Sequence, residues 1–429
     1  MNNSRGIEKL CFEQDCEPIW IQRDEGVKKW CQQNNVECIE RVGHTLWNPH
    51  EVIKLNGGTP PVTFAMFNHV ISSIGLPPRP LPDVNLSEIE VVKLNPMPEA
   101  GLLDHFPSCE DVGVQPEKHT TGKIYIGGES HALTHLEKRM SIESNAFKGN
   151  SFLPNRRNPQ LLCPPKSLSP DLRFGSLSIR KFYWRVMDAF KESQRGTAKP
   201  FNPQIVIQLL WREFFYTMSV NNQFFGEMDR NEICINIPWY PINKNNNFNA
   251  FCNAQTGYPL IDAGVRQILK EGWIHHIIRN ALACFLTRGD LWISWEEGLK
   301  FFLKHLLDAD WSVCAGNWMW ISSSAFEEVL NCSTCIDPGT FGRRADPWGD
   351  YIRIYIPELA NYPVEYIYEP WTAPLDVQEK AGCIIGKDYP ERIVRHEEAS
   401  QRNCMEMNNI KERLLKELNQ VSLELAFFH

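Results

Sequence analysis

The chain is 429 residues long, 43% hydrophobic and 22% charged, and its 52 acidic and 44 basic residues give a net charge of -8. This composition excludes an intrinsically disordered chain, and the length is sufficient for two domains. The acidic balance argues against a general basic surface for nucleic acid but leaves room for a local basic groove.

The N-terminal stretch and the cysteine content bear on the cellular compartment. The stretch "MNNSRGIEKL" has no apolar signal core, and no apolar run approaches the roughly 20 residues that a membrane-spanning helix needs. We therefore expect a soluble protein, cytoplasmic and nuclear, whose 14 cysteines are mostly reduced. Only Cys332 and Cys335 have metal-ligand spacing, and one such pair falls short of the four ligands of tetrahedral zinc, so no metal site is predicted.

The first elements predict a small α/β layer. Residues 16–42 show an apolar run, then helical spacing, then β-branched alternation, which predicts a strand, an amphipathic helix and a strand. Two strands are fewer than the about five or six of a usual open sheet. The proline-rich, acidic stretch that follows predicts a linker. We place a partial α/β domain in residues 1–75 and the linker in residues 76–127.

From Gly128 onward the apolar spacing is helical. Gly128, Glu129 and Ser130 predict the start of a helix. Further helices are predicted at residues 204–220, 260–273, 275–289, 292–311 and 409–425. Because no repeat period recurs, we predict one helical domain over residues 128–405 and a tail helix over residues 406–429.

The segment "LLDADWSVCAGNWMW", residues 306–320, combines two carboxylates, a thiol and three indoles. In a helix, Asp310, Cys314 and Trp318 would share one face, whereas Asp308 would point elsewhere and need another partner. Buried carboxylates must be paired or bind something, and a surface aspartate pair beside core tryptophans is the alternative. Arg279 in "HHIIRN" is an ionic partner for one of the two aspartates.

Two further motifs carry polar groups at regular spacing. "KSLSP" offers two hydroxyls and a cation, which suit a phosphate, although Ser-Pro turns are common and an ordinary turn is the favoured alternative. In "QLLWREFF", Gln208, Trp211 and Phe215 share one helix face.

These motifs identify a family. The runs "WREFFYTMSVNN", "QTGYPLIDAGVRQILKEGWIHHIIRN" and "FLTRGDLWISWEEGLKFFLKHLLDADWSVCAGNWMW" are long and collinear, and they resemble the photolyase/cryptochrome flavoproteins. The resemblance implies a multi-domain fold, with a partial N-terminal Rossmann-like α/β domain and a C-terminal all-helical FAD-binding domain of photolyase type. The chain enters the α/β domain partway through the family pattern, so no antenna chromophore is expected beside FAD.

The resemblance also assigns site residues. It places nine side chains around FAD: Arg139, Ser167, Ser169, Gln208, His276, Arg279, Asp308, Asp310 and Cys314. It implies no catalytic residue but an electron-transfer chain of Trp318, Trp295 and Trp239, with Trp292 as an outer fourth member. Indole is readily oxidised, and ordinary core packing is the alternative for each tryptophan.

Three departures favour a photoreceptor over a repair enzyme. Asn280 stands where (6-4) repair enzymes carry a second histidine after His276, and an amide cannot serve as their general acid. Cys314 stands where photolyases usually carry Asn near the flavin, and a thiol is a weak hydrogen-bond donor. Phe427, Phe428 and His429 resemble the aromatic tail motif of insect light-sensing cryptochromes, except at the last position.

The resemblance therefore implies a blue-light photoreceptor of the circadian clock, of the insect type 1 kind and without repair activity. FAD would be photoreduced to an anionic radical, and the tail would be released from the flavin cavity. The implied partners are clock proteins of the timeless and period kind and a ubiquitin-ligase adaptor, with no membrane and weak or absent DNA binding. The alternatives are a DNA photolyase and a light-independent clock transcriptional repressor.

Overall fold

The computed structural model describes residues 7–82, 84–88, 108–114, 125–149, 159, 161–162, 167–193, 203–242, 246–326, 330 and 335–427. Its strands are β1 (Lys9–Glu13) and β2 (Glu37–Arg41). Its helices up to α8 are α1 (Pro18–Gln33), α2 (Pro49–Leu55), α3 (Phe64–Ile74), α4 (Glu129–Phe147), α5 (Ser169–Arg173), α6 (Ile179–Ser193), α7 (Gln204–Ser219) and α8 (Asn247–Cys252). The later helices are α9 (Pro259–Glu271), α10 (His276–Cys284), the π-helix η3 (Phe285–Gly289), α11 (Trp295–His305), α12 (Trp311–Ile321), α13 (Pro338–Ala345), α14 (Asp350–Tyr355), α15 (Leu375–Ala381) and α16 (His396–Phe427).

The N-terminal part is a small α/β unit, as predicted. β1 and β2 are parallel, with Lys9 opposite Glu37, and α1 connects them. The strand predicted near residue 16 is wrong, because Pro18 opens α1 and the strand lies earlier, at Lys9–Glu13. Proline favours the first turn of a helix, where its missing N–H has no partner in any case.

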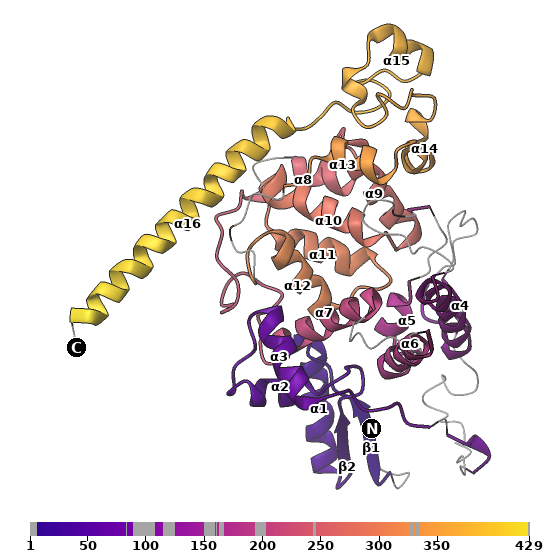
Figure 1. The fold of residues 1–429 in the computed structure, drawn as a ribbon, viewed down its shortest axis with the longest axis vertical. Coiled ribbons are helices and arrows are strands. Elements are labelled where there is room, and N and C mark those ends of the chain that lie inside the picture. The colour runs from indigo at the N-terminus through magenta and orange to yellow at the C-terminus, as the bar shows by residue number, and fades with distance from the viewer. Residues whose placement is uncertain are drawn as a thin grey trace.

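The rest of the described chain is helical, and Figure 1 shows α7 between the α/β unit and the helices α8 to α13. The predicted helices at residues 204–220 and 260–273 are α7 and α9. Residues 275–289 do not form one α-helix, because α10 ends at Cys284 and Thr287 has non-helical angles in the π-helical turn. The stretch 292–311 holds the shorter α11, which Ser294 caps by accepting a hydrogen bond from the N–H of Glu296.

The C-terminal part differs from the predicted boundary. α16 begins at His396 and continues to Phe427, so the predicted tail helix starts inside a longer helix. Phe428 and His429, and the side chain of Phe427, lie outside the described residues, as does most of the predicted linker. None of the helices in the described ranges is long and apolar enough to cross a membrane.

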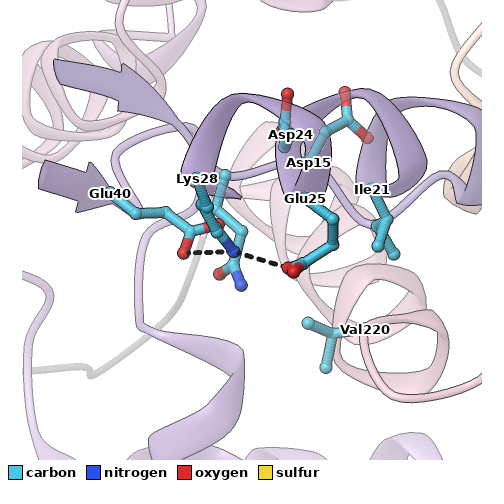
Figure 2. Close-up of a pocket in the computed structure, with 8 residues that line it drawn as sticks. Asp15, Ile21, Asp24, Glu25, Lys28, Glu40 and Val220 are labelled. Carbon is cyan, nitrogen blue, oxygen red and sulfur yellow. Dashed lines mark hydrogen bonds and ion pairs between the residues drawn. The ribbon is translucent and has the colours of Figure 1, made fainter. Parts of the chain in front are cut away.

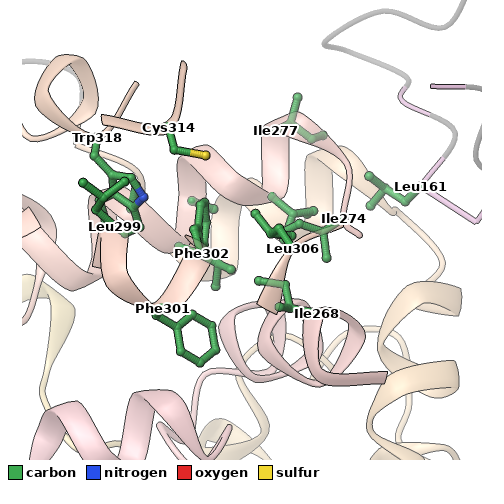
Figure 3. Close-up of a cluster of buried hydrophobic side chains, with 14 of the residues drawn as sticks. Leu161, Ile268, Ile274, Ile277, Leu299, Phe301, Phe302, Leu306, Cys314 and Trp318 are labelled. Carbon is green, nitrogen blue, oxygen red and sulfur yellow. The ribbon is translucent and has the colours of Figure 1, made fainter. Parts of the chain in front are cut away.

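The core of the helical part lies where α10, α11 and α12 meet, and Figure 3 shows its apolar side chains. Trp295 on α11 and Trp318 on α12 are among its largest fully buried side chains. Gly298 on α11 permits this packing, because a β-carbon added there would lie 2.1 Å from the Trp318 ring.

Replacing Gly298 by Ala is expected to lower the free energy of unfolding by about 1–3 kcal/mol, because the buried ring of Trp318 would have to move. Gly26 in α1 is the matched control, since a β-carbon there would meet nothing within 4 Å. Gly26→Ala should raise the free energy of unfolding by about 0.5–1 kcal/mol through helix propensity. Urea denaturation measures both effects, and equal effects of the two variants would contradict this account of Gly298.

Candidate functional site

Three segments that are far apart in the sequence meet at the carboxylate of Asp308, which lies between α11 and α12. The guanidinium of Arg279 on α10 donates to Oδ2 of Asp308 over 2.9 Å. The hydroxyl of Ser169, at the start of α5, donates to the same oxygen over 2.6 Å. The Ser169 oxygen also lies 2.7 Å from the hydroxyl oxygen of Ser167. The predicted pairing of Arg279 with one of the two aspartates is therefore confirmed, with Asp308 as the partner, and four predicted site residues are neighbours.

The Arg279–Asp308 pair is largely desolvated, with 21% of the Arg279 side chain and 4% of the Asp308 side chain exposed. Burial alone would lower the pKa of Arg279, but the charge of Asp308 and the hydrogen bond to it raise that pKa overall. Arg279 therefore remains charged. Tyr125 lies within electrostatic reach of both ions, and burial, with the charge of Asp308, raises the pKa of this phenol.

Two buried polar atoms beside this pair have no hydrogen-bond partner within the described ranges: Oδ1 of Asp308 and the hydroxyl of Tyr125. A buried polar group without a hydrogen bond costs about 1–3 kcal/mol. This cost indicates that a bound group forms hydrogen bonds with both atoms. A flavin nucleotide offers hydroxyl groups that can donate to a carboxylate and carbonyl oxygens that can accept from a phenol. The residues present therefore fit FAD.

Cys314 lies on α12 close to the same ion pair, and 7% of it is exposed. Burial raises the pKa of its thiol to about 12, although Arg279 acts in the opposite direction. The thiol is therefore protonated near neutral pH and is a weak donor. Figure 3 shows Cys314 and Trp318 as neighbours on α12, with Phe302 close by.

The carboxylate of Asp310, which the resemblance places around FAD, is hydrogen-bonded by groups of the protein itself. It is the N-cap of α12, where Oδ1 accepts a hydrogen bond from the N–H of Val313 over 2.9 Å. Its Oδ2 accepts a hydrogen bond from the hydroxyl of Tyr216 on α7. Both carboxylate oxygens are thus engaged by the protein, so Asp310 positions the start of the helix that carries Cys314 and Trp318.

The histidine pair lies at the start of α10. Nδ1 of His275 caps the helix by accepting from the N–H of Ile277 over 3.3 Å, and the ring of His276 lies 4.3 Å from that of His275. His276 is exposed, whereas His275 is half-buried. Burial, with the nearby charges of His276 and Arg279, lowers the pKa of His275 to about 3.

We expect His275 to make the protein less stable in acid. Because its pKa falls from 6.5 in the unfolded chain to about 3 in the folded one, only the unfolded chain binds a proton between these values. The free energy of unfolding should therefore fall as pH decreases below 6.5, by at most about 1.4 kcal/mol per pH unit. Urea denaturation at pH 8 and pH 5 measures this loss.

The variant His275→Asn keeps a capping side chain and removes the titrating group, so its loss between the two pH values should be smaller. His69→Asn, at an exposed position on α3, is the control. An unchanged pH dependence in His275→Asn would show that other groups cause the acid destabilisation.

Two predicted cofactor residues lie apart from the Asp308 network. Arg139 on α4 donates from Nε to Glu143 over 2.8 Å, one turn later on the same helix. Glu143 is 1% exposed, and its Oε2 has no partner among the described side chains. Gln208 is exposed on α7. The structure therefore brings together Ser167, Ser169, Arg279 and Asp308, but it does not join Arg139 or Gln208 to them.

Of the four predicted electron-transfer tryptophans, Trp239 and Trp292 form a ring pair, whereas Trp295 and Trp318 lie on the neighbouring helices α11 and α12. Trp318 and Trp295 are 1% and 0% exposed, and the ring of Trp318 lies against Gly298, one turn after Trp295 on α11. The ring centroids of Trp239 and Trp292 are 4.9 Å apart. The indole N–H groups of Trp318, Trp295 and Trp239 have no hydrogen-bond partner in the part of the chain that is described.

Trp292 differs from its predicted outer position. It is 2% exposed, because Met407 and Ile410 of α16 pack against it. Trp239 is half-buried and is therefore the member of this pair nearer to solvent. The correction has a physical reason, since the long helix α16 covers the turn that carries Trp292.

A separate pocket of about 120 Å³ opens in the α/β unit, beside α1 and β2 (Figure 2). It is lined by Gln14, Asp15, Ile21, Asp24, Glu25, Lys28, Glu40 and Val220. Lys28 is bound by Glu25 and Glu40, each at 3.0 Å. The remaining carboxylates would repel phosphate groups, so this pocket does not suit a nucleotide. The cysteines and acidic groups in the described ranges also form no cluster that could hold a metal.

Two functional candidates were missed by the sequence reasoning. Tyr216 follows Arg212 by four residues on α7, so helical spacing could have placed it on the polar face. Tyr125 precedes the glycines at the start of α4 and carries no periodic signal. Its position next to Asp308 depends on contacts between distant segments.

Comparisons with known proteins agree with this arrangement. Residues 205–409 match the family described as the FAD binding domain of DNA photolyase, and residues 2–84 match the DNA photolyase family. Cryptochrome-1 of Aedes aegypti is 49% identical over 420 residues, 96% of this chain and 76% of that protein. Cryptochrome-1 of Drosophila melanogaster is 47% identical over 418 residues, 95% of this chain and 77% of that protein. A bacterial class III photolyase from Agrobacterium tumefaciens superposes with a TM-score of 0.75 at 25% identity, over 95% of this chain and 80% of that one.

Proposed function

Because the chain belongs to the photolyase/cryptochrome family, we propose that it is a blue-light photoreceptor of the insect type 1 kind rather than a repair enzyme. The identities of 49% and 47% to insect Cryptochrome-1 proteins support this choice. Bound FAD would supply the absorption of blue light and the capacity to accept an electron.

The series of buried indoles is the observation that carries the proposal. Trp318 lies on the helix of Cys314, its ring packs against Gly298 one turn after Trp295, and Trp239 and Trp292 form a ring pair in which Trp239 is nearer to solvent. In this proposal Trp318 would donate the first electron, and Trp295 would then donate an electron to the oxidised Trp318. Indole N–H groups without hydrogen-bond partners are unusual in a core built only for packing.

The chain's own groups would hold and tune the cofactor. Asp308, fixed by Arg279 and Ser169, has one carboxylate oxygen left to accept from the cofactor, and Tyr125 has a hydroxyl to donate. Cys314 holds its proton, so it gives the cofactor only a weak hydrogen bond. No antenna chromophore is part of this proposal.

The signal would leave through the C-terminal helix. Met407 and Ile410 of α16 pack on Trp292, which links the indole series directly to α16. A change in charge at the indoles would alter the packing of α16 and release the C-terminal tail, residues 406–429. The proposed binding partners are clock proteins of the timeless and period kind and a ubiquitin-ligase adaptor. The protein would meet them in the cytoplasm and the nucleus.

A DNA photolyase is the second candidate. The half-buried indoles of Trp211 and Trp320 lie edge to face with centroids 4.7 Å apart, and such a pair could stack nucleic-acid bases. Repair of damaged oligonucleotides under blue light would establish this enzyme instead. A light-independent clock repressor would bind its partners equally with and without flavin.

Absorption spectra of the purified chain, in the dark and after blue light, test the proposal. We expect oxidised flavin to co-purify and its absorption to decrease under light. A chain that binds flavin but shows no light-driven change would refute the photoreceptor function. A chain without flavin would refute the assignment of the cofactor site.

A further inference from the structure

Two cysteines meet at a place that the proposed function does not use. Cys284, the last residue of α10, is 0% exposed, whereas Cys335, three residues before α13, is half-buried. Both are free thiols. The two thiols lie close enough for each to shift the pKa of the other. The N–H of Ile336 donates to the sulfur of Cys284 over 3.4 Å, which holds the two segments together.

The surroundings of Cys335 favour a thiolate. The guanidinium of Arg288 donates to its sulfur over 3.6 Å, and Nε of Arg288 is held by the carbonyl of Ile321 over 2.6 Å. The hydrogen bond from Cys284 and the charge of Arg288 outweigh burial and lower the pKa of Cys335 to about 7. Half-buried Cys252 lacks such partners, and burial raises the pKa of its thiol to about 11.

We propose that Cys335 reacts with hydroperoxides and that Cys284 converts the product into an intramolecular disulfide. The Cys335 sulfur attacks one peroxide oxygen, the O–O bond breaks, and water or an alcohol leaves while Cys335 becomes a sulfenic acid. The Cys284 sulfur then attacks the Cys335 sulfur, the S–O bond breaks, and water leaves with the Cys284 proton. The peroxide is reduced, and the two thiols are oxidised by two electrons.

The disulfide would join the two segments that hold the start of α16. Oδ1 of Asp290, which follows η3, lies 2.8 Å from Nδ1 of His396, the first residue of α16. Oδ2 of Asp337, two residues after Cys335, lies 3.6 Å from Nε2 of the same ring. Oxidation of the pair would therefore tie the α10–η3 segment to the α13 segment at the base of α16.

Alkylation and peptide mass spectrometry of the purified full chain test this proposal. At pH 7, iodoacetamide should modify Cys335 about 10- to 100-fold faster than Cys252, since its larger thiolate fraction outweighs its lower nucleophilicity. One equivalent of hydrogen peroxide should then produce a peptide cross-linked through Cys284 and Cys335. Cys252→Ser is the matched control and should give the same cross-link.

The variant Cys284→Ser should stop at the sulfenic acid, which dimedone traps on Cys335. Equal alkylation rates of Cys335 and Cys252, or peroxide treatment without the cross-link, would overturn the proposal. If Cys284→Ser does not fold, the cross-link in the unchanged chain still decides the matter.

Discussion

Replacing Trp318 by Phe is expected to abolish the light-driven decrease of flavin absorption while the flavin stays bound. Trp318 is 1% exposed and its indole N–H has no hydrogen-bond partner within the described chain, so the smaller ring removes no polar contact. Phenylalanine is much harder to oxidise than tryptophan. Since each roughly 1.4 kcal/mol of added barrier slows a step about tenfold, the rate of photoreduction should fall by more than about tenfold.

Trp320→Phe is the matched control for this prediction. Trp320 lies on the same helix, two residues later, and its ring contacts Trp211 rather than Gly298. The flavin of the Trp320→Phe variant should therefore be photoreduced at the rate of the unchanged chain. Equal photoreduction rates for the two variants would remove Trp318 from the proposed electron path. Flavin content, measured after denaturation, separates this outcome from loss of the cofactor.

Breaking the Arg279–Asp308 pair from either side is expected to lower the free energy of unfolding by about 3–5 kcal/mol, because the remaining buried charge loses its partner. The proposed variants are Arg279→Met and Asp308→Leu. The double variant replaces the pair by apolar side chains and should lose much less stability than the sum of the single changes. Urea denaturation of the four proteins gives the coupling energy directly.

An exposed ion pair provides the comparison. Arg343 and Glu369 lie 2.6 Å apart with 41% and 28% of their side chains exposed, so Arg343→Met should cost no more than about 1 kcal/mol. Additive losses at Arg279 and Asp308 would contradict the strong pairing inferred here. Arg279→Met and Asp308→Leu should also co-purify with less flavin, because the first change frees the carboxylate of Asp308 to move and the second removes it.

Helical periodicity predicted several elements correctly. The apolar spacing of residues 204–220 and 260–273 corresponds to α7 and α9, and the Gly128 signal corresponds to the start of α4. Local errors arose where two signals competed. The apolar run after Cys16 suggested a strand, yet Pro18 begins α1 there, and the spacing of residues 275–289 did not reveal the turn at Thr287.

The candidate site was predictable only in part. The sequence motifs identified the family and the set of residues, and they included Arg279, Asp308 and Cys314, which the structure places together. Spacing left open which aspartate pairs with Arg279. The structure assigns Asp308 to that pair and Asp310 to the cap of α12, with Tyr216 as its second partner.

The sequence by itself determined α7, α9, the start of α4 and the family, because these depend on local spacing and collinear motifs. The tertiary structure alone decided that α16 buries Trp292 and that the segments of Cys284 and Cys335 meet. Both contacts join segments more than 45 residues apart. Such contacts form only when helices pack, and no periodicity in a single segment encodes them.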